Sequence, residues 1–223
     1  MTRIMKSRPI RTRRPKRAIR RAPPRAVRAK KPPTTLVVGL TGPNASGKGE
    51  VAKFLASLGF SVRSLSDVVR DEATRQGLDH SRDNLIRIGV EMRARHGPGA
   101  LARSVLPRLK GRAVVDSIRN PGEVAVLRGL PHFLLVGIDA PQSLRFQRSI
   151  VRGRMGDGAT LEEFARKEER ENSTTPAGQQ LLATLAEADI VIDNDGTIED
   201  LRARVREALE DRGIALNDDR SRS

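Results

Sequence analysis

Short apolar runs alternate along this chain with longer amphipathic segments. The apolar runs are continuous and do not alternate with polar residues. Continuous Val, Ile and Leu runs are typical of strands that are buried on both faces, whereas strands with one face in water alternate. The pattern therefore predicts a mostly parallel five-stranded sheet between two helical layers, with strands near residues 36–40, 60–65, 113–116, 133–138 and 190–192.

Polar capping residues mark the starts of several helices. Asn120, Thr160 and Thr197 each stand three residues before an acid, which is the spacing of a capping box, and Pro121 occupies a first-turn position. We therefore expect a helix after each of these residues. The last helix should pack one face on the sheet, through Ile198, Leu201, Val205 and Leu209.

Residues 66–110, between the second and third predicted strands, are numerous enough to form a substructure of their own. Helical spacing predicts one helix that ends near Gly97 and a second that begins at about Leu101. The apolar positions that support the first of these helices are Leu85, Ile88 and Met92.

Charge is distributed very unevenly along the chain. The formal net charge is +15, and residues 1–31 hold 14 Lys and Arg with no Asp or Glu, which leaves +1 for residues 32–223. The basic segment has too few large apolar side chains to fold alone. We expect a disordered tail at 1–33, one α/β domain at 34–214 and a short flexible C-terminus at 215–223.

The tail has two interpretations. Its cations could hold nucleic acid or another polyanion without sequence specificity, through residues 1–31. Alternatively, it is a solvated extension without a dedicated partner. The sequence contains no run of about 18–20 apolar residues, so we expect no membrane span and a cytoplasmic protein. With no cysteine, disulfides, thiolate metal sites and cysteine nucleophiles are excluded.

A glycine-rich loop follows the first apolar run directly and ends in Lys48. In a strand–loop–helix context, such a loop directs backbone N–H groups at phosphates, and the helix N-terminus adds partial positive charge. The lysine can then reach the outer phosphates. The sequence thus predicts a nucleoside triphosphate site formed by Gly42, Pro43, Asn44, Ala45, Ser46, Gly47, Lys48, Gly49 and Glu50.

Several segments outside the loop resemble the nucleotide-kinase branch of the P-loop fold. Residues 66–70 resemble the acceptor-binding segment of adenylate kinase, and residues 114–119 resemble the third-strand segment that leads to an acceptor-phosphate arginine. Residues 188–197 are similar to the last strand and helix start of dephospho-coenzyme A kinase. The chain also resembles a little-characterised, largely archaeal family of dephospho-coenzyme-A-kinase-like proteins, through residues 47–50 and 97–100 and its basic stretch at 148–154.

This resemblance implies transfer of the γ-phosphate of ATP, with Mg²⁺, to a dephospho-coenzyme-A-like or nucleoside monophosphate acceptor. It implies an acceptor-binding region at about 66–110. Arg70 of this region and Arg119, after the third strand, would hold the acceptor phosphate. Asp67 would orient the acceptor hydroxyl, or would only cap a helix from about Val68.

The resemblance also implies a lid at about 148–172. Arg148, Arg152 and Arg154 would close over the donor phosphates, although the first two could equally form a solvated basic stripe. Asp116, at the end of a buried strand, would hold Mg²⁺ through water.

One feature departs from most P-loops. Gly49 stands where a magnesium-binding Ser or Thr usually follows the lysine, and Glu50 comes next. The adenylate kinase branch also has glycine after its lysine, so the kinase hypothesis is retained. Two alternatives stay open: a nucleic-acid-binding or regulatory ATPase that uses the basic tail, and a nucleotide-binding domain without catalysis.

Overall fold

The computed structural model describes residues 35–153 and 157–216, which belong to one compact unit. The predicted tail, Arg154 and most of the predicted C-terminal segment lie outside these residues.

Five parallel strands form one sheet in the order β2-β3-β1-β4-β5. The fold class predicted from the sequence is thus confirmed. Each strand lies at or within a few residues of its predicted position. The bounds are β1 Leu36–Thr41, β2 Ser61–Ser64, β3 Arg112–Ile118, β4 His132–Asp139 and β5 Ile190–Asp193.

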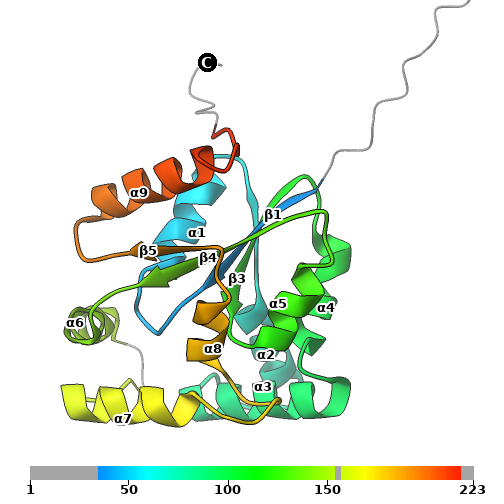
Figure 1. Cartoon of the computed structure of the whole chain (residues 1–223). Helices are drawn as coiled ribbons and strands as arrows, with labels where there is room; N and C mark the ends of the chain where they lie inside the picture. Colours follow the sequence, from blue (N-terminus) through cyan, green and yellow to red (C-terminus); the bar gives the residue numbers. More distant parts are fainter. Residues whose placement is uncertain (1–34, 154–156, 217–223) are drawn as a thin grey trace, which may run out of the picture. The chain divides into compact units, whose positions relative to one another are not determined.

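Helices cover both faces of this sheet (Figure 1). Helices α1 and α9 pack together on one face, whereas α2, α4, α5 and α8 cover the other. On the first face, α1 spans Lys48–Ser57 and α9 spans Ile198–Glu210. On the second face, the bounds are α2 Leu65–Arg75, α4 Ala100–Val105, α5 Pro121–Leu127 and α8 Leu181–Ala186. The remaining helical elements are α3 Arg82–His96, η1 Leu106–Arg108, α6 Gln142–Arg152 and α7 Leu161–Glu171.

Strand β1 shows why the apolar runs are continuous. Val38 and Leu40 belong to the core beneath α1 and α9, and Val37 belongs to the core on the opposite face. Because successive side chains of a strand point to opposite faces, both faces of the sheet must be apolar. All three side chains are fully buried.

The predicted caps are present at all three positions. The side chains of Asn120, Thr160 and Thr197 accept backbone N–H bonds at the starts of α5, α7 and α9. Two details differ from the expectations from sequence. Helix α2 begins at Leu65, before the expected Val68. Ile198 remains 47% exposed, because α9 buries its other apolar positions instead.

A bulge in β3 shapes the carboxyl edge of the sheet. The pairing of β1 with β3 shifts between Gly39 and Thr41, and Ser117 has a positive φ of 65°. A bulge adds a residue on one strand and changes where the neighbouring side chains point. Here it lies directly after Asp116, at the edge where ligands bind in open parallel sheets.

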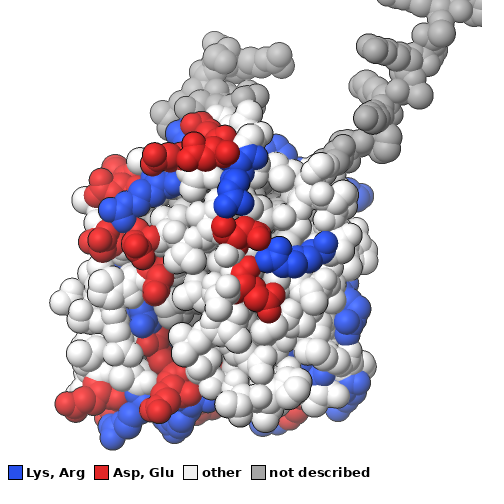
Figure 2. All heavy atoms as spheres, viewed as in Figure 1, with Lys and Arg blue, Asp and Glu red and all other residues white. Residues whose placement is uncertain are grey.

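The visible surface of the folded unit carries charges of both signs, interspersed (Figure 2). This agrees with the small net charge of residues 32–223. Within the described ranges, none of the helices combines the length and the apolar character that crossing a membrane requires.

Candidate functional site

The glycine-rich loop joins β1 to α1 and adopts a conformation that requires glycine at two positions. Gly42 has φ of 135° and Gly47 has φ of 110°, values that side chains rarely tolerate. A Cβ atom at Gly47 would lie 2.2 Å from the Asn194 side-chain nitrogen. That nitrogen donates to the Ser46 carbonyl at 2.7 Å, so the start of the β5–α9 connection holds the loop in place.

Lys48 lies folded against its own loop. Its ammonium group donates to the carbonyl oxygens of Gly42 at 2.8 Å and Pro43 at 2.7 Å. Burial, reinforced by the nearby cation of Arg119, lowers the pKa of Lys48 to about 7. A buried ammonium whose charged form is disfavoured gains strongly from an anionic ligand, because the ligand restores the missing counter-charge.

A cleft of about 680 Å³ opens in front of the loop. Its lining includes polar and cationic residues as well as apolar ones. The loop residues Asn44 to Glu50 form its floor, with Asp116, Arg119, Arg148 and Arg152 around them. Leu144, Val151, Ile198 and Leu201 line the apolar side, which explains why Ile198 is not packed in the core.

Asp116 lies at the carboxyl end of β3 and lines this cleft. One carboxylate oxygen accepts from the Ser117 hydroxyl at 3.2 Å. The other, Oδ1, is buried and has no hydrogen-bond partner among the described residues. A buried carboxylate oxygen without a partner is costly, so the site is suited to a cation or a donor from a ligand.

Arg119 lines the cleft from the loop after β3. Its guanidinium donates to Gln179 at 2.9 Å, while its Nε is buried without a partner in the described part of the chain. Burial lowers the pKa of Arg119. Its backbone N–H donates to Glu123 at 2.9 Å, which fixes the loop from α5.

Glu123 is itself half of a buried ion pair. Arg93 of α3 donates two bonds to one carboxylate oxygen, at 2.9 and 2.8 Å, and the two side chains are 3% and 0% exposed. Its spacing from Asn120 predicts that Glu123 is a capping acid at the start of α5. Its carboxylate instead serves Arg93 and the Arg119 backbone, and nothing local in the sequence reveals that pairing.

The basic residues of α6 lie over the loop. Arg148 donates to Asn194 at 3.4 Å and has one buried guanidinium nitrogen without a partner among the described residues. Arg152 donates to the Asn44 side chain at 3.0 Å and to Asp157 at 2.6 Å. Arg148 is half-buried and Arg152 is 36% exposed, and both have polar partners; their role over the donor phosphates stays a prediction.

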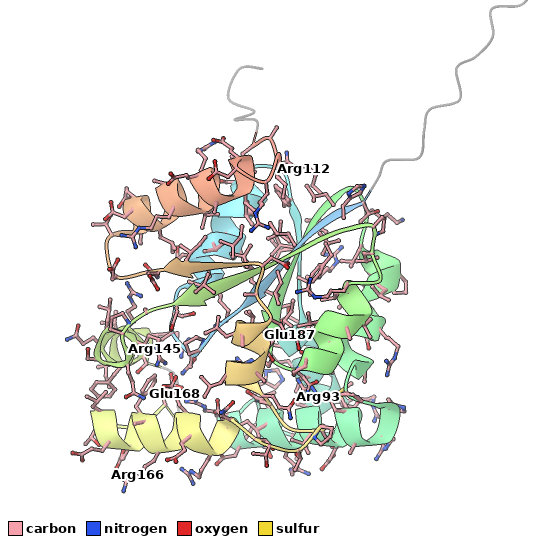
Figure 3. All side chains as sticks on the ribbon, in the orientation of Figure 1. Arg93, Arg112, Arg145, Arg166, Glu168 and Glu187 are labelled. Atoms are coloured by element: carbon pink, nitrogen blue, oxygen red, sulfur yellow. The ribbon has the colours of Figure 1, made fainter. Side chains whose placement is uncertain are left out.

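A third arginine of α6, Arg145, was not anticipated from the sequence. It donates to the Asn44 carbonyl at 3.3 Å and pairs with Glu168 of α7 (Figure 3). Its guanidinium also lies over the Phe164 ring, 5.8 Å from the centroid. These contacts anchor α7 to α6 beside the loop.

A separate, narrow cavity of about 70 Å³ adjoins the cleft. Arg82, at the start of α3, lines it, donates to Asp157 at 2.6 Å and pairs with Glu171. Asp157 and Glu171 come from segments distant in sequence, so no local pattern could have found this cluster.

The remaining predicted residues behave differently from one another. Arg70 lines both the cleft and the cavity, but Asp67 lines neither; it pairs with Arg70 at 2.7 Å and is 65% exposed. Because α2 begins at Leu65, Asp67 lies within the first turn and is not its cap. Glu50 lies in the first turn of α1, where the helix dipole favours an acid, and pairs with Lys53 at 2.8 Å.

Comparisons with known proteins identify the family and the fold. A family model described as an AAA domain matches residues 41–165. A UPF0200 protein of Methanoculleus marisnigri is 35% identical over 178 residues, covering 78% of this chain and 94% of that protein.

Two solved structures share the fold. TT1252 from Thermus thermophilus has 23% identity and a TM-score of 0.55, with 79% of this chain and 97% of that chain covered. Shikimate kinase from Acinetobacter baumannii, solved with shikimate, has 16% identity and a TM-score of 0.54, with 82% and 97% covered. With its parallel sheet and glycine-rich loop, the chain has a P-loop kinase fold, and it belongs to the UPF0200 family.

Proposed function

We propose that this protein is an ATP-dependent phosphotransferase that moves the γ-phosphate of ATP to a small anionic acceptor. The observation that carries the proposal is the convergence of Lys48, Arg119 and Asp116, whose Oδ1 has no partner among the described residues, on one cleft at the carboxyl edge of the sheet. Phosphoryl transfer needs positioned reactants and positive charge around the transferring group more than it needs covalent help from the protein.

Each part of the cleft has a role in this proposal. The loop amides and Lys48 hold the donor phosphates, and Arg148 and Arg152 lie over them and exclude water. Arg70 and Arg119 hold the acceptor anion, since both line the adjoining cavity as well. Arg154 is assigned to the donor side by the sequence alone, and the exposed position of Asp67 gives its assignment no support.

Magnesium fits the residues present. Oδ1 of Asp116, which has no partner among the described residues, would hold the metal through water. Mg²⁺ in such sites commonly keeps several waters beside one or two carboxylates and the substrate phosphates. Asp116 would hold the metal, because Gly49 has no hydroxyl group that could serve as a ligand. When bound, the metal would neutralise phosphate charge and orient the transferring group.

The direct test is a transfer assay with γ-labelled ATP and Mg²⁺ against dephospho-coenzyme A, nucleoside monophosphates and compact hydroxy acids. We expect label to move to one of these acceptors with the wild-type protein and not with Lys48→Met. ATP binding without transfer to any acceptor would favour the non-catalytic nucleotide-binding domain.

The ATPase alternative rests on residues 1–31. Deleting residues 1–33 separates it from the kinase proposal. An unchanged transfer rate supports the kinase, whereas ATP hydrolysis that requires RNA or DNA and the tail supports the alternative.

A further inference from the structure

The narrow cavity beside the donor cleft has a chemistry of its own. The two spaces share the lining residues Asn44, Ser66, Arg70, Ser117 and Arg119. A group bound in the cavity would therefore lie next to the place where the donor phosphates end. Because an acceptor in the cavity can react only if the cleft binds a donor, a role for the cavity rests on the proposed function.

Two arginines enter this cavity with hydrogen-bonding capacity to spare. Arg82 Nη2 and Arg119 Nε are buried, and neither has a partner among the described residues. Other nitrogens of the two groups hold them in place: Nε and Nη1 of Arg82 pair with Glu171 and Asp157, and Nη1 of Arg119 donates to Gln179. Fixed guanidinium groups with free N–H bonds are pre-oriented donors for an oxyanion.

The charged side chains of the cavity are mostly paired, and Arg119 is the exception. Four arginines line it, against the two carboxylates of Asp157 and Glu171. Both carboxylates already accept from Arg82. Arg93 is paired with Glu123 and Arg70 with Asp67. Arg119 is thus the lining arginine without an ion-pair partner among the described residues, and its charge is available to an anion.

Size and wall chemistry limit what that anion can belong to. A volume of about 70 Å³ admits a group the size of a carboxylate, sulfate or phosphate, since one water position needs about 10–15 Å³. Pockets for drug-sized ligands span about 300–1,000 Å³. The lining contains no Phe, Tyr or Trp to stack on a base, and its one ring, the imidazole of His80, is hydrogen-bonded to Thr74. The apolar part of the lining is aliphatic, from Leu65, Val69, Leu85, Ile86 and Leu101.

We propose that this cavity binds the oxyanion of a compact acceptor, a carboxylate- or phosphate-bearing alcohol and not a nucleoside monophosphate, with Arg82 and Arg119 as its ligands. Arg82 is thereby assigned to the substrate site. The acceptor hydroxyl would then face the shared lining residues and the donor phosphates. The wall of α2, α3 and α4 would select against bulky substituents on the anion-bearing end.

The test uses the full chain saturated with a non-hydrolysable ATP analogue and Mg²⁺, so that the loop is occupied. Inorganic phosphate, sulfate and acetate are titrated at constant ionic strength, and binding is followed by calorimetry or NMR. We expect one of these anions to bind, and Arg82→Gln to weaken it about tenfold or more, as the loss of one charge-assisted hydrogen bond implies. Tighter binding of phosphate or sulfate than of acetate indicates a phosphorylated acceptor. Tighter binding of acetate indicates a carboxylic acid.

The matched control is Arg87→Gln, also on α3. Arg87 is exposed and pairs with Glu91 on the surface, so its loss should leave anion binding unchanged. If Arg82→Gln fails to fold, Arg119→Gln removes the other ligand without touching Asp157 or Glu171, and the same loss is expected. Analogue affinity should stay within about twofold in Arg87→Gln, and every variant is titrated with anion at saturating analogue.

Three results would overturn the inference. Nucleotide-loaded wild-type protein that binds none of the three anions has no such site. Equal anion affinity in wild type, Arg82→Gln and Arg119→Gln places the anion elsewhere. Adenosine monophosphate that binds the loaded protein far more tightly than phosphate, in an Arg82-dependent way, makes the acceptor a nucleotide. If the analogue itself does not bind, the proposed function fails instead.

Discussion

Two arginines that line the same narrow cavity have opposite surroundings. Arg93 is closed off: its guanidinium donates two bonds to Glu123, and both side chains are almost completely buried. Arg119 retains a buried Nε without a partner among the described residues, and burial lowers its pKa. The comparison separates two uses of a buried cation, since a paired one supports the fold and an incompletely paired one is available to a ligand.

Removing the partner of Arg93 should have the largest effect. Glu123→Ala leaves the Arg93 cation buried and unpaired and also removes the acceptor for the Arg119 backbone. Breaking a buried pair in this way costs about 3–5 kcal/mol. Urea unfolding measures this loss in the free energy of unfolding.

The control for that variant is Glu91→Ala, which breaks the exposed Arg87–Glu91 pair on α3, the helix that carries Arg93. It should change the free energy of unfolding by no more than about 0.5 kcal/mol. Equal destabilisation by the two variants would show that burial of the Arg93–Glu123 pair is not what makes it important.

A substitution in the glycine-rich loop should have the next largest effect on stability. Gly47→Ala places a side chain at φ of 110° and 2.2 Å from Asn194, a strain of about 1–3 kcal/mol. Nucleotide affinity should fall with it, because the Asn194 bond to the loop is displaced. Gly49→Ala is the matched control: nothing lies within 4 Å of its Cβ, and a helical Ala should raise stability by up to about 1 kcal/mol.

Lys48 should make nucleotide affinity depend on pH. Burial and Arg119 lower its pKa to about 7 in the free protein, and a bound phosphate should raise it again. Above pH 7 binding must then take up a proton, so ADP affinity should fall by about tenfold per pH unit until the pKa of the complex is reached. Calorimetry in buffers of different ionisation heat would detect that proton. A flat profile above pH 7 would contradict the assignment.

Arg119 should matter least for stability. Arg119→Met removes a cation with an unpartnered nitrogen, at the loss of one bond to Gln179. The free energy of unfolding should stay within about 1 kcal/mol of wild type, or rise, as residues kept for binding often allow. A loss as large as that of Glu123→Ala would abolish the distinction between the two arginines.

Local patterns predicted the fold and the strand–loop–helix geometry of the glycine-rich loop well, for identifiable reasons. Strand burial on both faces, the capping residues and the Gly47-Lys48 step are encoded within a few neighbouring residues. The cluster around Arg82 is not, because Asp157 lies 75 positions away and Glu171 lies 89 away. Pairings over such distances follow from packing and cannot be read from spacing. The disorder expected for residues 1–33 remains a prediction, because these residues lie outside the described part of the chain.

Asn194 shows an intermediate case. It stands in a segment whose sequence resembles dephospho-coenzyme A kinase, yet its bond to the Ser46 carbonyl was not anticipated. The neighbouring position of β4 and β5 brings the end of the last strand to the loop, and only the sheet order shows it.

The most direct test of the proposed donor site is calorimetric titration of a non-hydrolysable ATP analogue, with Mg²⁺, into wild type and Lys48→Met. We predict that the wild type binds and that Lys48→Met loses about tenfold to hundredfold in affinity, the value of hydrogen bonds from a charged group, while remaining folded by circular dichroism. Equal affinity in the two folded proteins would contradict the proposal that the phosphates lie in the loop beside Lys48.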